Sequence, residues 1–180
     1  MAGKIFLLTG LPGSGKTTLM LKVAEELKRR GFKIGGMATR EVRERGVRVG
    51  FEIIDLATGE KGILAWVGGG SGPRVGKYLV NLRDLDGVGV KAVRRALSEA
   101  DVVFVDEVGP MELYSEEFRS AVREAAGSGK PLIATVHYRA RDRLISELKT
   151  AASRLFEVNA ATREEVYRRL LGEVSASLKG

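Results

Sequence analysis

GLPGSGKT, residues 10–17, is the stretch that decides the fold of this 180-residue chain. It matches the pattern G-x-x-x-x-G-K-[ST] at every fixed position. The apolar run before it, Lys4–Thr9, predicts a buried strand. The stretch after it, from about Lys16 to Arg30, predicts a helix with apolar residues at four-residue intervals, which Gly31 ends. The motif therefore lies in a strand–loop–helix unit.

This context identifies residues 10–17 as a phosphate-binding loop. Its glycines permit positive φ and leave space for successive main-chain N–H groups to converge on phosphate oxygens. The positive end of the following helix adds to this attraction. We expect Lys16 to reach the β- and γ-phosphates and the Thr17 hydroxyl to bind Mg²⁺. The predicted nucleotide-binding residues are Gly10, Leu11, Pro12, Gly13, Ser14, Gly15, Lys16, Thr17 and Thr18.

The rest of the chain alternates short apolar runs with longer amphipathic stretches. This pattern predicts an α/β fold in which helices flank a mostly parallel sheet. Further strands are predicted at Lys33–Thr39, Tyr78–Leu82, Asp101–Asp106, Pro131–Val136 and Leu155–Val158. Further helices are predicted at Val90–Ala100, after an N-cap at Ser115, around Leu144–Leu148, and after a capping box at Thr162–Glu165.

Residues from about 40 to 67 depart from this alternation. Two strand-like segments, Val49–Leu56 and Gly62–Trp66, flank the turn-forming residues 57–60, so we predict an antiparallel hairpin inserted into the α/β scheme. The glycine-rich residues 68–73 predict a loop, which is either a lid over the nucleotide or a plain linker. Without repeats or a domain boundary, residues 1–180 are expected to form a single domain.

Composition limits the classes of function. The chain has no Cys and one His, which excludes disulfide frameworks and the usual zinc spacings, so any metal should be bound by oxygen. No apolar stretch approaches the ~18 residues of a membrane span, and we expect a cytoplasmic protein without a membrane partner. The formal net charge of +7 favours anionic partners, and nucleic acid is one possible partner.

Two adjacent acids end the most apolar predicted strand. Asp106 closes the run and Glu107 follows it, so both should project at the carboxyl edge of the sheet, where open α/β folds bind ligands. Asp106 fits the Walker B acid that orients Mg²⁺. A carboxylate directly after that acid can hold a water in line with the γ-phosphate and accept its proton. We therefore predict Lys16 and Glu107 as catalytic, and Thr17 and Asp106 as metal-binding.

Three further residues are weaker candidates. Thr135 ends the predicted strand 131–136, where a polar side chain can sense the γ-phosphate; a strand-end Thr that is merely hydrogen-bonded is the alternative. Arg40 and Arg141 stand in basic clusters, and either can supply the cation that neutralises transition-state charge. A solvated basic surface is the alternative for both.

Beyond the loop, one run of residues resembles a known family. Together with the loop, Asp106-Glu107-Val108-Gly109-Pro110-Met111-Glu112-Leu113 resembles the small thermophile nucleoside-triphosphatases, whose vertebrate relatives are called cancer-related nucleoside-triphosphatase. The resemblance covers essentially the whole chain. It implies a RecA-like fold and Mg²⁺-dependent hydrolysis of ATP, GTP and other triphosphates to the diphosphate, with little base preference. It places the family's magnesium acid at Asp106 and its presumed base at Glu107.

Two other functions remain open on the sequence alone. A nucleotide or polynucleotide kinase can use the same loop, and the 68–73 loop and basic clusters suit a kinase lid. The Asp106-Glu107 pair favours water as the acceptor instead. A triphosphate-switched module that binds nucleic acid is the second alternative. The sequence does not decide the oligomeric state.

Overall fold

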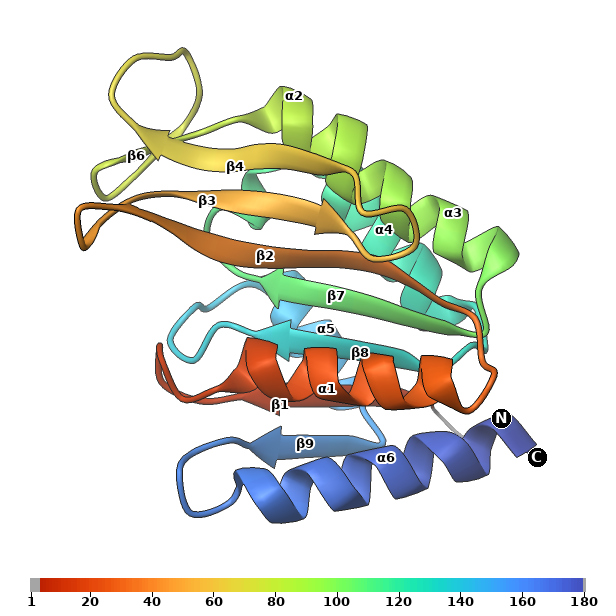
Figure 1. The fold of residues 1–180 in the computed structure, drawn as a ribbon. Coiled ribbons are helices and arrows are strands. Elements are labelled where there is room, and N and C mark those ends of the chain that lie inside the picture. Colours follow the sequence, from red (N-terminus) through yellow and green to blue (C-terminus); the bar gives the residue numbers. More distant parts are fainter. Residues whose placement is uncertain (1–3, 180) are drawn as a thin grey trace.

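The computed structural model describes residues 4–179; Met1–Gly3 and Gly180, the ends of the predicted domain, lie outside them. Within these residues nine strands form one sheet, in the order β5-β6-β4-β3-β2-β7-β8-β1-β9 (Figure 1). Helices cover both faces, which confirms the predicted α/β class. None of the helices between residues 4 and 179 combines the length and apolar composition that a membrane crossing needs.

One side of the sheet is parallel. Its pairs are β2 with β7, β7 with β8, β8 with β1, and β1 with β9. The strands are β1 (Ile5–Thr9), β2 (Ile34–Glu44), β7 (Val102–Val108), β8 (Leu132–Val136) and β9 (Arg154–Glu157). All five residues of β8 are buried, because helices lie on both faces of this part of the sheet. The strand predicted at Pro131–Val136 is β8, and it pairs directly with the loop strand β1.

The other side of the sheet is antiparallel and larger than predicted. Its strands are β3 (Val47–Asp55), β4 (Lys61–Val67), β5 (Arg74–Val75) and β6 (Tyr78–Val80). The hairpin predicted from Val49–Leu56 and Gly62–Trp66 is present as β3 and β4. In addition, β2 continues past Thr39 to Glu44 and pairs antiparallel with β3. The sequence concealed this continuation because residues 40–44 are mostly charged and exposed. Strand β6 lies within the predicted strand Tyr78–Leu82 and pairs with β4. Strand β5 pairs with β6 and, at two residues, is too short to produce a hydrophobic period.

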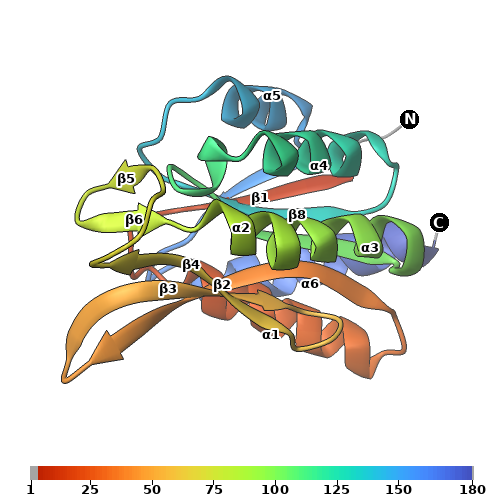
Figure 2. The ribbon, with the colours of Figure 1, turned by 90° about the horizontal axis from the view of Figure 1, so that it is seen from above.

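The helices form two layers (Figure 2). Helices α1 (Lys16–Arg29) and α6 (Arg163–Lys179) pack on one face, around Leu19, Val23 and Leu170. The other face carries Val93, Phe118 and Leu148 from three helical segments. The elements of this layer are α2 (Leu82–Asp84), a π-helical segment η1 (Leu85–Val90), α3 (Lys91–Glu99), a 3₁₀ turn η2 (Glu112–Tyr114), α4 (Glu116–Gly127) and α5 (Arg143–Ala151).

The helix predicted at Val90–Ala100 begins earlier in the structure. Helical conformation starts at Leu82, where the Asn81 side chain accepts a hydrogen bond from the Asp84 N–H. The predicted strand Tyr78–Leu82 accordingly ends at Val80. Glycines at 87 and 89 argue against a helix on propensity. Gly89 is retained by packing, because a Cβ there would lie 3.0 Å from Met37 Sδ.

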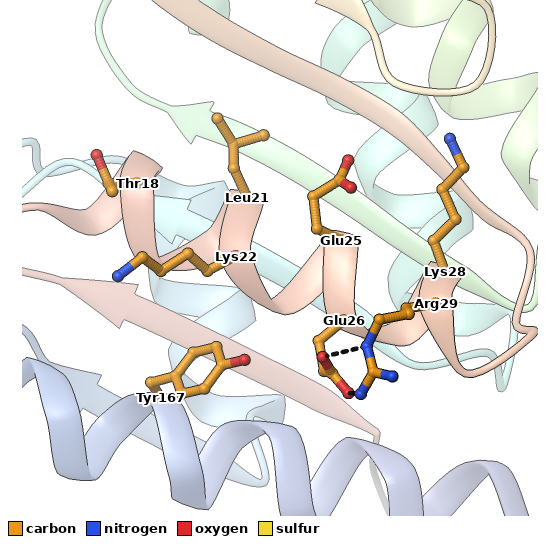
Figure 3. A pocket seen from close by; sticks show the side chains of 8 residues that line it. All are labelled: Thr18, Leu21, Lys22, Glu25, Glu26, Lys28, Arg29 and Tyr167. Atoms are coloured by element: carbon orange, nitrogen blue, oxygen red, sulfur yellow. Dashed lines mark hydrogen bonds and ion pairs between the residues drawn. The ribbon is translucent and has the colours of Figure 1, made fainter.

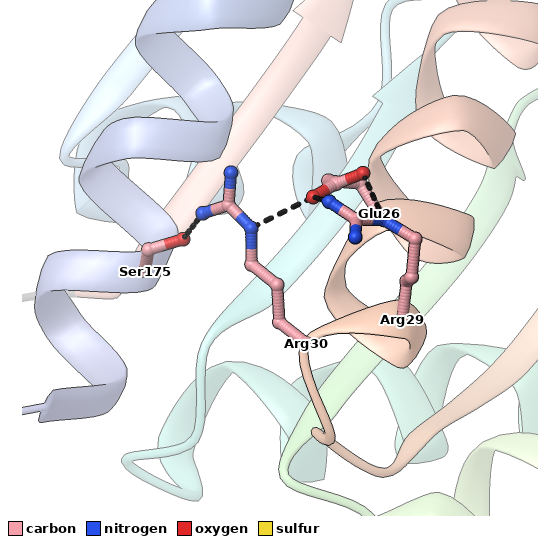
Figure 4. Close-up of polar contacts among 4 residues, drawn as sticks. All are labelled: Glu26, Arg29, Arg30 and Ser175. Atoms are coloured by element: carbon pink, nitrogen blue, oxygen red, sulfur yellow. Dashed lines mark hydrogen bonds and ion pairs between the residues drawn. The ribbon is translucent and has the colours of Figure 1, made fainter.

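Polar contacts join α1 to α6 near the C-terminal ends of the two helices. Glu26 accepts from Arg29 and Arg30, and Arg30 Nη1 also donates to Ser175 Oγ at 3.1 Å (Figure 4). At the start of α6 the expected capping box is not formed. The Thr162 hydroxyl donates to the Glu157 carbonyl and accepts from the Asn159 N–H. Thr162 therefore stabilises the turn that precedes the helix.

Ser115 is the N-cap of α4, as predicted, and its burial makes it a sensitive position. Its hydroxyl accepts from the Phe118 N–H at 2.9 Å and donates to Asp86, with 3% of the residue exposed. We expect Ser115→Ala to lower the free energy of unfolding by about 1–2 kcal/mol, because it removes the cap and leaves a carboxylate oxygen unpaired. Chemical denaturation followed by circular dichroism measures this.

Ser120→Ala is the matched control, because Ser120 is exposed in the middle of the same helix. We expect no loss of stability there, since alanine has the higher helix propensity. Equal losses for the two variants would contradict the capping role of Ser115.

Candidate functional site

The candidate site lies where the parallel strands end. The loops after β1, β7, β8 and β9 meet at one edge of the sheet, the left edge in Figure 1. β1 leads into residues 10–17, β7 carries the acids and β8 carries Thr135. Open α/β sheets bind ligands at this edge. The topology thus brings together residues that are up to about 125 positions apart, Gly10 and Thr135 among them.

The loop conformation depends on its glycines. Gly15, the N-cap of α1, has φ +97°, a left-handed conformation that disfavours side chains. A Cβ at Gly10 would lie 2.4 Å from the carbonyl oxygen of Val158, the residue after β9. The loop is thus tightly packed against the β9–α6 connection. Ser14 Oγ is buried there and has no hydrogen-bond partner among residues 4–179.

Lys16 is held over the loop by main-chain carbonyls. Its Nζ donates to Gly10 O at 2.6 Å and to Leu11 O at 3.4 Å, and only 9% of the residue is exposed. This places a buried ammonium at the centre of a loop lined with N–H groups. Such an arrangement concentrates positive potential where a phosphate would sit.

Asp106 is the point at which several elements converge. Its carboxylate accepts from Thr17 Oγ1 at 2.9 Å, from Thr135 Oγ1 at 2.6 Å and from the Thr39 N–H at 3.3 Å. Burial raises the pKa of Asp106, while these hydrogen bonds and the charge of Lys16 oppose the rise. One carboxylate therefore links α1, β2 and β8 to the end of β7.

The oxygen atoms of Thr17 and Asp106 fit a hard divalent cation. Within residues 4–179 no group of three or more His, Cys, Asp or Glu side chains forms a complete metal cage. Mg²⁺ does not need one, because it commonly uses one or two protein oxygens together with water and substrate phosphates. The donor set thus suits Mg²⁺ that arrives with a polyphosphate.

Glu107 lies beside Asp106 and is half-buried. The pairing of β7 with β8 shifts register between Val105 and Val108, and the Asp106–Glu107 peptide bond is cis. Burial, followed by the negative charge of Asp106, raises the pKa of Glu107 to about 7, while Lys16 acts in the opposite direction. A carboxyl with a pKa near neutrality is suited to accept and release a proton.

Glu112 is a third buried acid, and the sequence indicated no role for it beyond the resemblance. It begins η2, is 3% exposed, and has its pKa raised well above the ordinary value by burial and then by the charge of Glu107. Hydrogen bonds from the main chain at Glu112 and Glu107 oppose that rise. Its only sequence signal is an acid placed five residues after Glu107 in an otherwise apolar, turn-forming run.

The three weaker candidates, Thr135, Arg40 and Arg141, differ in the contacts that they make. Thr135 is fully buried and donates to Asp106, so its hydroxyl is directed to the carboxylate and not to an open site. Arg40 pairs with Glu52 on the neighbouring strand β3 at 2.5 Å. Arg141 is exposed after β8 and makes no hydrogen bond or ion pair with any residue in 4–179. A role of either arginine in neutralising transition-state charge therefore stays a prediction.

His137 follows β8 at the same edge. Its Nδ1 accepts from the main-chain N–H groups of Arg139 and Ala140, at 3.2 and 3.1 Å. Burial lowers the pKa of His137, and the charges of Lys16 and Arg139 lower it further. The imidazole therefore stabilises its own turn as a neutral ring with the proton on Nε2.

Comparisons with known proteins agree with this geometry. A family model described as NTPase matches residues 5–171. The chain is 52% identical to Nucleoside-triphosphatase THEP1 of Thermofilum pendens over 178 residues, which cover 98% of each chain. It is 46% identical to the protein of the same name from Methanocaldococcus jannaschii, over 96% of this chain and 98% of that one.

Solved structures show the same fold. THEP1 from the hyperthermophile Aquifex aeolicus superimposes with a TM-score of 0.82 at 31% identity, over 94% of this chain and 98% of that one. A human cancer-related nucleoside triphosphatase superimposes with a TM-score of 0.79 at 32% identity, over 97% of this chain and 98% of that one. With a loop built to hold phosphates and a family model that spans nearly all of its length, the chain belongs to the THEP1-like family of P-loop nucleoside-triphosphatases.

Proposed function

We propose that this enzyme hydrolyses nucleoside triphosphates at the β–γ anhydride, with Mg²⁺, to yield the nucleoside diphosphate and phosphate. One observation carries the proposal: a half-buried acid whose pKa is raised to about 7, Glu107, directly follows Asp106, which is hydrogen-bonded to the loop residue Thr17. Phosphate-binding residues and a proton acceptor thus share one site. The names of the relatives support the same reaction class.

Substrate binding should exchange the internal contacts of the loop for contacts to phosphate. Lys16 Nζ, which donates to Gly10 O and Leu11 O, would turn to β- and γ-phosphate oxygens. The N–H groups of residues 13–18 would hold the β- and α-phosphates. Thr17 and Asp106 would hold Mg²⁺, which would neutralise negative charge on the β- and γ-phosphates. These contacts are to phosphates alone, which favours ATP, GTP and other triphosphates alike.

The chemical step then needs one proton transfer. Glu107 holds a water opposite the β–γ bridging oxygen and accepts its proton as the water oxygen bonds to the γ-phosphorus. The bond from that phosphorus to the bridging oxygen breaks, and the diphosphate leaves with the electron pair. Glu107 can afterwards return the proton to the released phosphate. Thr135 acts through Asp106, whose carboxylate it orients.

Lys16→Ala tests the phosphate site. The variant should bind triphosphates more weakly and lose at least about 10²-fold in turnover, because the β- and γ-phosphate oxygens lose their fixed cation. Calorimetry with a non-hydrolysable triphosphate and a phosphate-release assay measure the two effects. Parent-level binding by a folded Lys16→Ala protein would contradict the assignment of residues 10–17.

Glu107→Gln tests the proton acceptor. Triphosphate affinity should stay at the parent value, while phosphate release falls about 10²- to 10⁴-fold because the amide cannot take a proton. Turnover at the parent rate would remove Glu107 from the mechanism. The same assay, run on the parent with γ-labelled triphosphate and added nucleosides or 5′-hydroxyl RNA, distinguishes free phosphate from transfer to a hydroxyl, which a kinase would give.

Thr135→Val tests the support of Asp106. The substitution preserves shape and removes the hydroxyl that donates to the carboxylate at 2.6 Å. We expect the Mg²⁺ concentration for half-maximal activity to rise about 10- to 100-fold, as for other residues that orient metal ligands. Thr150→Val, at an exposed position on α5, is the control and should leave the Mg²⁺ requirement unchanged. An unchanged requirement in Thr135→Val would contradict the role.

A further inference from the structure

Arg163 lies directly against the phosphate-binding loop. A Cβ built on Gly15 would be 3.2 Å from Arg163 Nη1 and 3.6 Å from its Cδ. The side chain is exposed and makes no hydrogen bond or ion pair with any described residue, 4 to 179. Its guanidinium therefore covers the third glycine of the loop and keeps its flat faces and N–H groups available to a ligand.

The strand order decides which part of a nucleotide reaches Arg163. The acids lie at the end of β7, two strands from β1 on one side, whereas β9 and the start of α6 lie on the other side of β1 (Figure 1). A triphosphate whose γ-phosphate lies by Asp106 and Glu107 must extend across the loop toward β9. Its nucleoside end consequently approaches the connection between β9 and α6, where Arg163 stands.

Space for a nucleoside exists on this side of the loop. Helices α1 and α6 border a groove of about 690 Å³ that begins at Thr18, directly after the loop. Tyr167, four residues after Arg163 on α6, faces α1 beside Lys22 (Figure 3). Residues four apart share one face of a helix, so Arg163 lies on the same face of α6 as Tyr167, one turn nearer to the loop.

The connection itself offers little that could distinguish one base from another. The side-chain oxygen of Asn159 accepts from the N–H groups of Ala161 and Thr162, and the Thr162 hydroxyl bonds to Glu157 and Asn159. These oxygens are used within the turn. Arg163 remains, and stacking of a guanidinium on a base tolerates every base because each has a π-face.

We infer that Arg163 is a nucleoside-binding residue, whose guanidinium stacks on the base of the bound triphosphate regardless of base identity. The inference rests on the proposed function, since it takes the triphosphate to lie with its γ-phosphate at Asp106. The phosphate-binding loop contacts phosphates alone. Arg163 would add a contact to the nucleoside and so increase the affinity for the whole nucleotide.

The test compares ligands with and without a base. Calorimetry with Mg²⁺ would measure the binding of inorganic tripolyphosphate and of non-hydrolysable analogues of ATP, GTP and CTP. Arg163→Ala should lower the affinity for each nucleotide by a similar factor, about 5- to 100-fold, because one stacking contact is lost. Its affinity for tripolyphosphate should equal that of the parent. Arg163→Lys should behave like Arg163→Ala, because it keeps the charge and loses the planar group.

Arg168→Ala is the matched control, with the same change of charge at an exposed position on the same helix. It should bind all four ligands as the parent does. Three results would overturn the inference: an equal loss for tripolyphosphate, which marks a phosphate contact; recovery by Arg163→Lys; or no loss for any nucleotide. Failure of the proposed function is measured separately on the parent, which would then release no free phosphate from a triphosphate, or would bind neither tripolyphosphate nor nucleotide.

Discussion

The buried carboxylate of Asp106 is the interaction on which the rest of the site depends. It accepts hydrogen bonds from Thr17, Thr135 and the main chain of Thr39, which belong to three different elements. A buried carboxylate without partners is costly, so the fold must keep these elements in register with the end of β7. The loop, the neighbouring strand and the acid pair are thereby fixed relative to one another before any ligand binds.

The negative charges of Asp106 and its neighbouring acids lie close to the positive charge of Lys16. Glu112 is also buried and Glu107 is half-buried. Besides burial, the charge of Asp106 raises the pKa of Glu107, and the charges of Glu107 and Asp106 raise the pKa of Glu112. The positive charge of the Lys16 ammonium opposes the rise in pKa of both Asp106 and Glu107. This crowding is unfavourable for stability alone, yet it produces a carboxyl near neutrality beside a phosphate site. Perturbed acids of this kind gather where proton transfer is needed.

The two parts of the sheet contribute differently to the site. The parallel strands carry the loop, the acids and Thr135 to a common edge. The antiparallel strands pair with β2 beyond Met37, where its parallel pairing with β7 ends, and Thr39, whose N–H reaches Asp106, lies in this part of β2. Arg40, the next residue, pairs with Glu52 of β3. The pairing of β2 with β3 therefore positions the main-chain N–H that supports the Asp106 carboxylate.

The sequence alone determined the features that depend on neighbouring residues. The loop, its strand and helix, the Asp106-Glu107 pair and the Ser115 cap all follow from local pattern, because glycine conformation, helix capping and strand burial act over a few positions. Tertiary structure alone decided which groups meet across long separations: Thr135 with Asp106, Arg40 with Glu52, and Arg163 with Gly15. It also buried Glu112 and retained a helix through Gly89. These contacts depend on how segments that are distant in the sequence pack together. Local sequence patterns do not show this packing, because they reflect interactions over only a few positions.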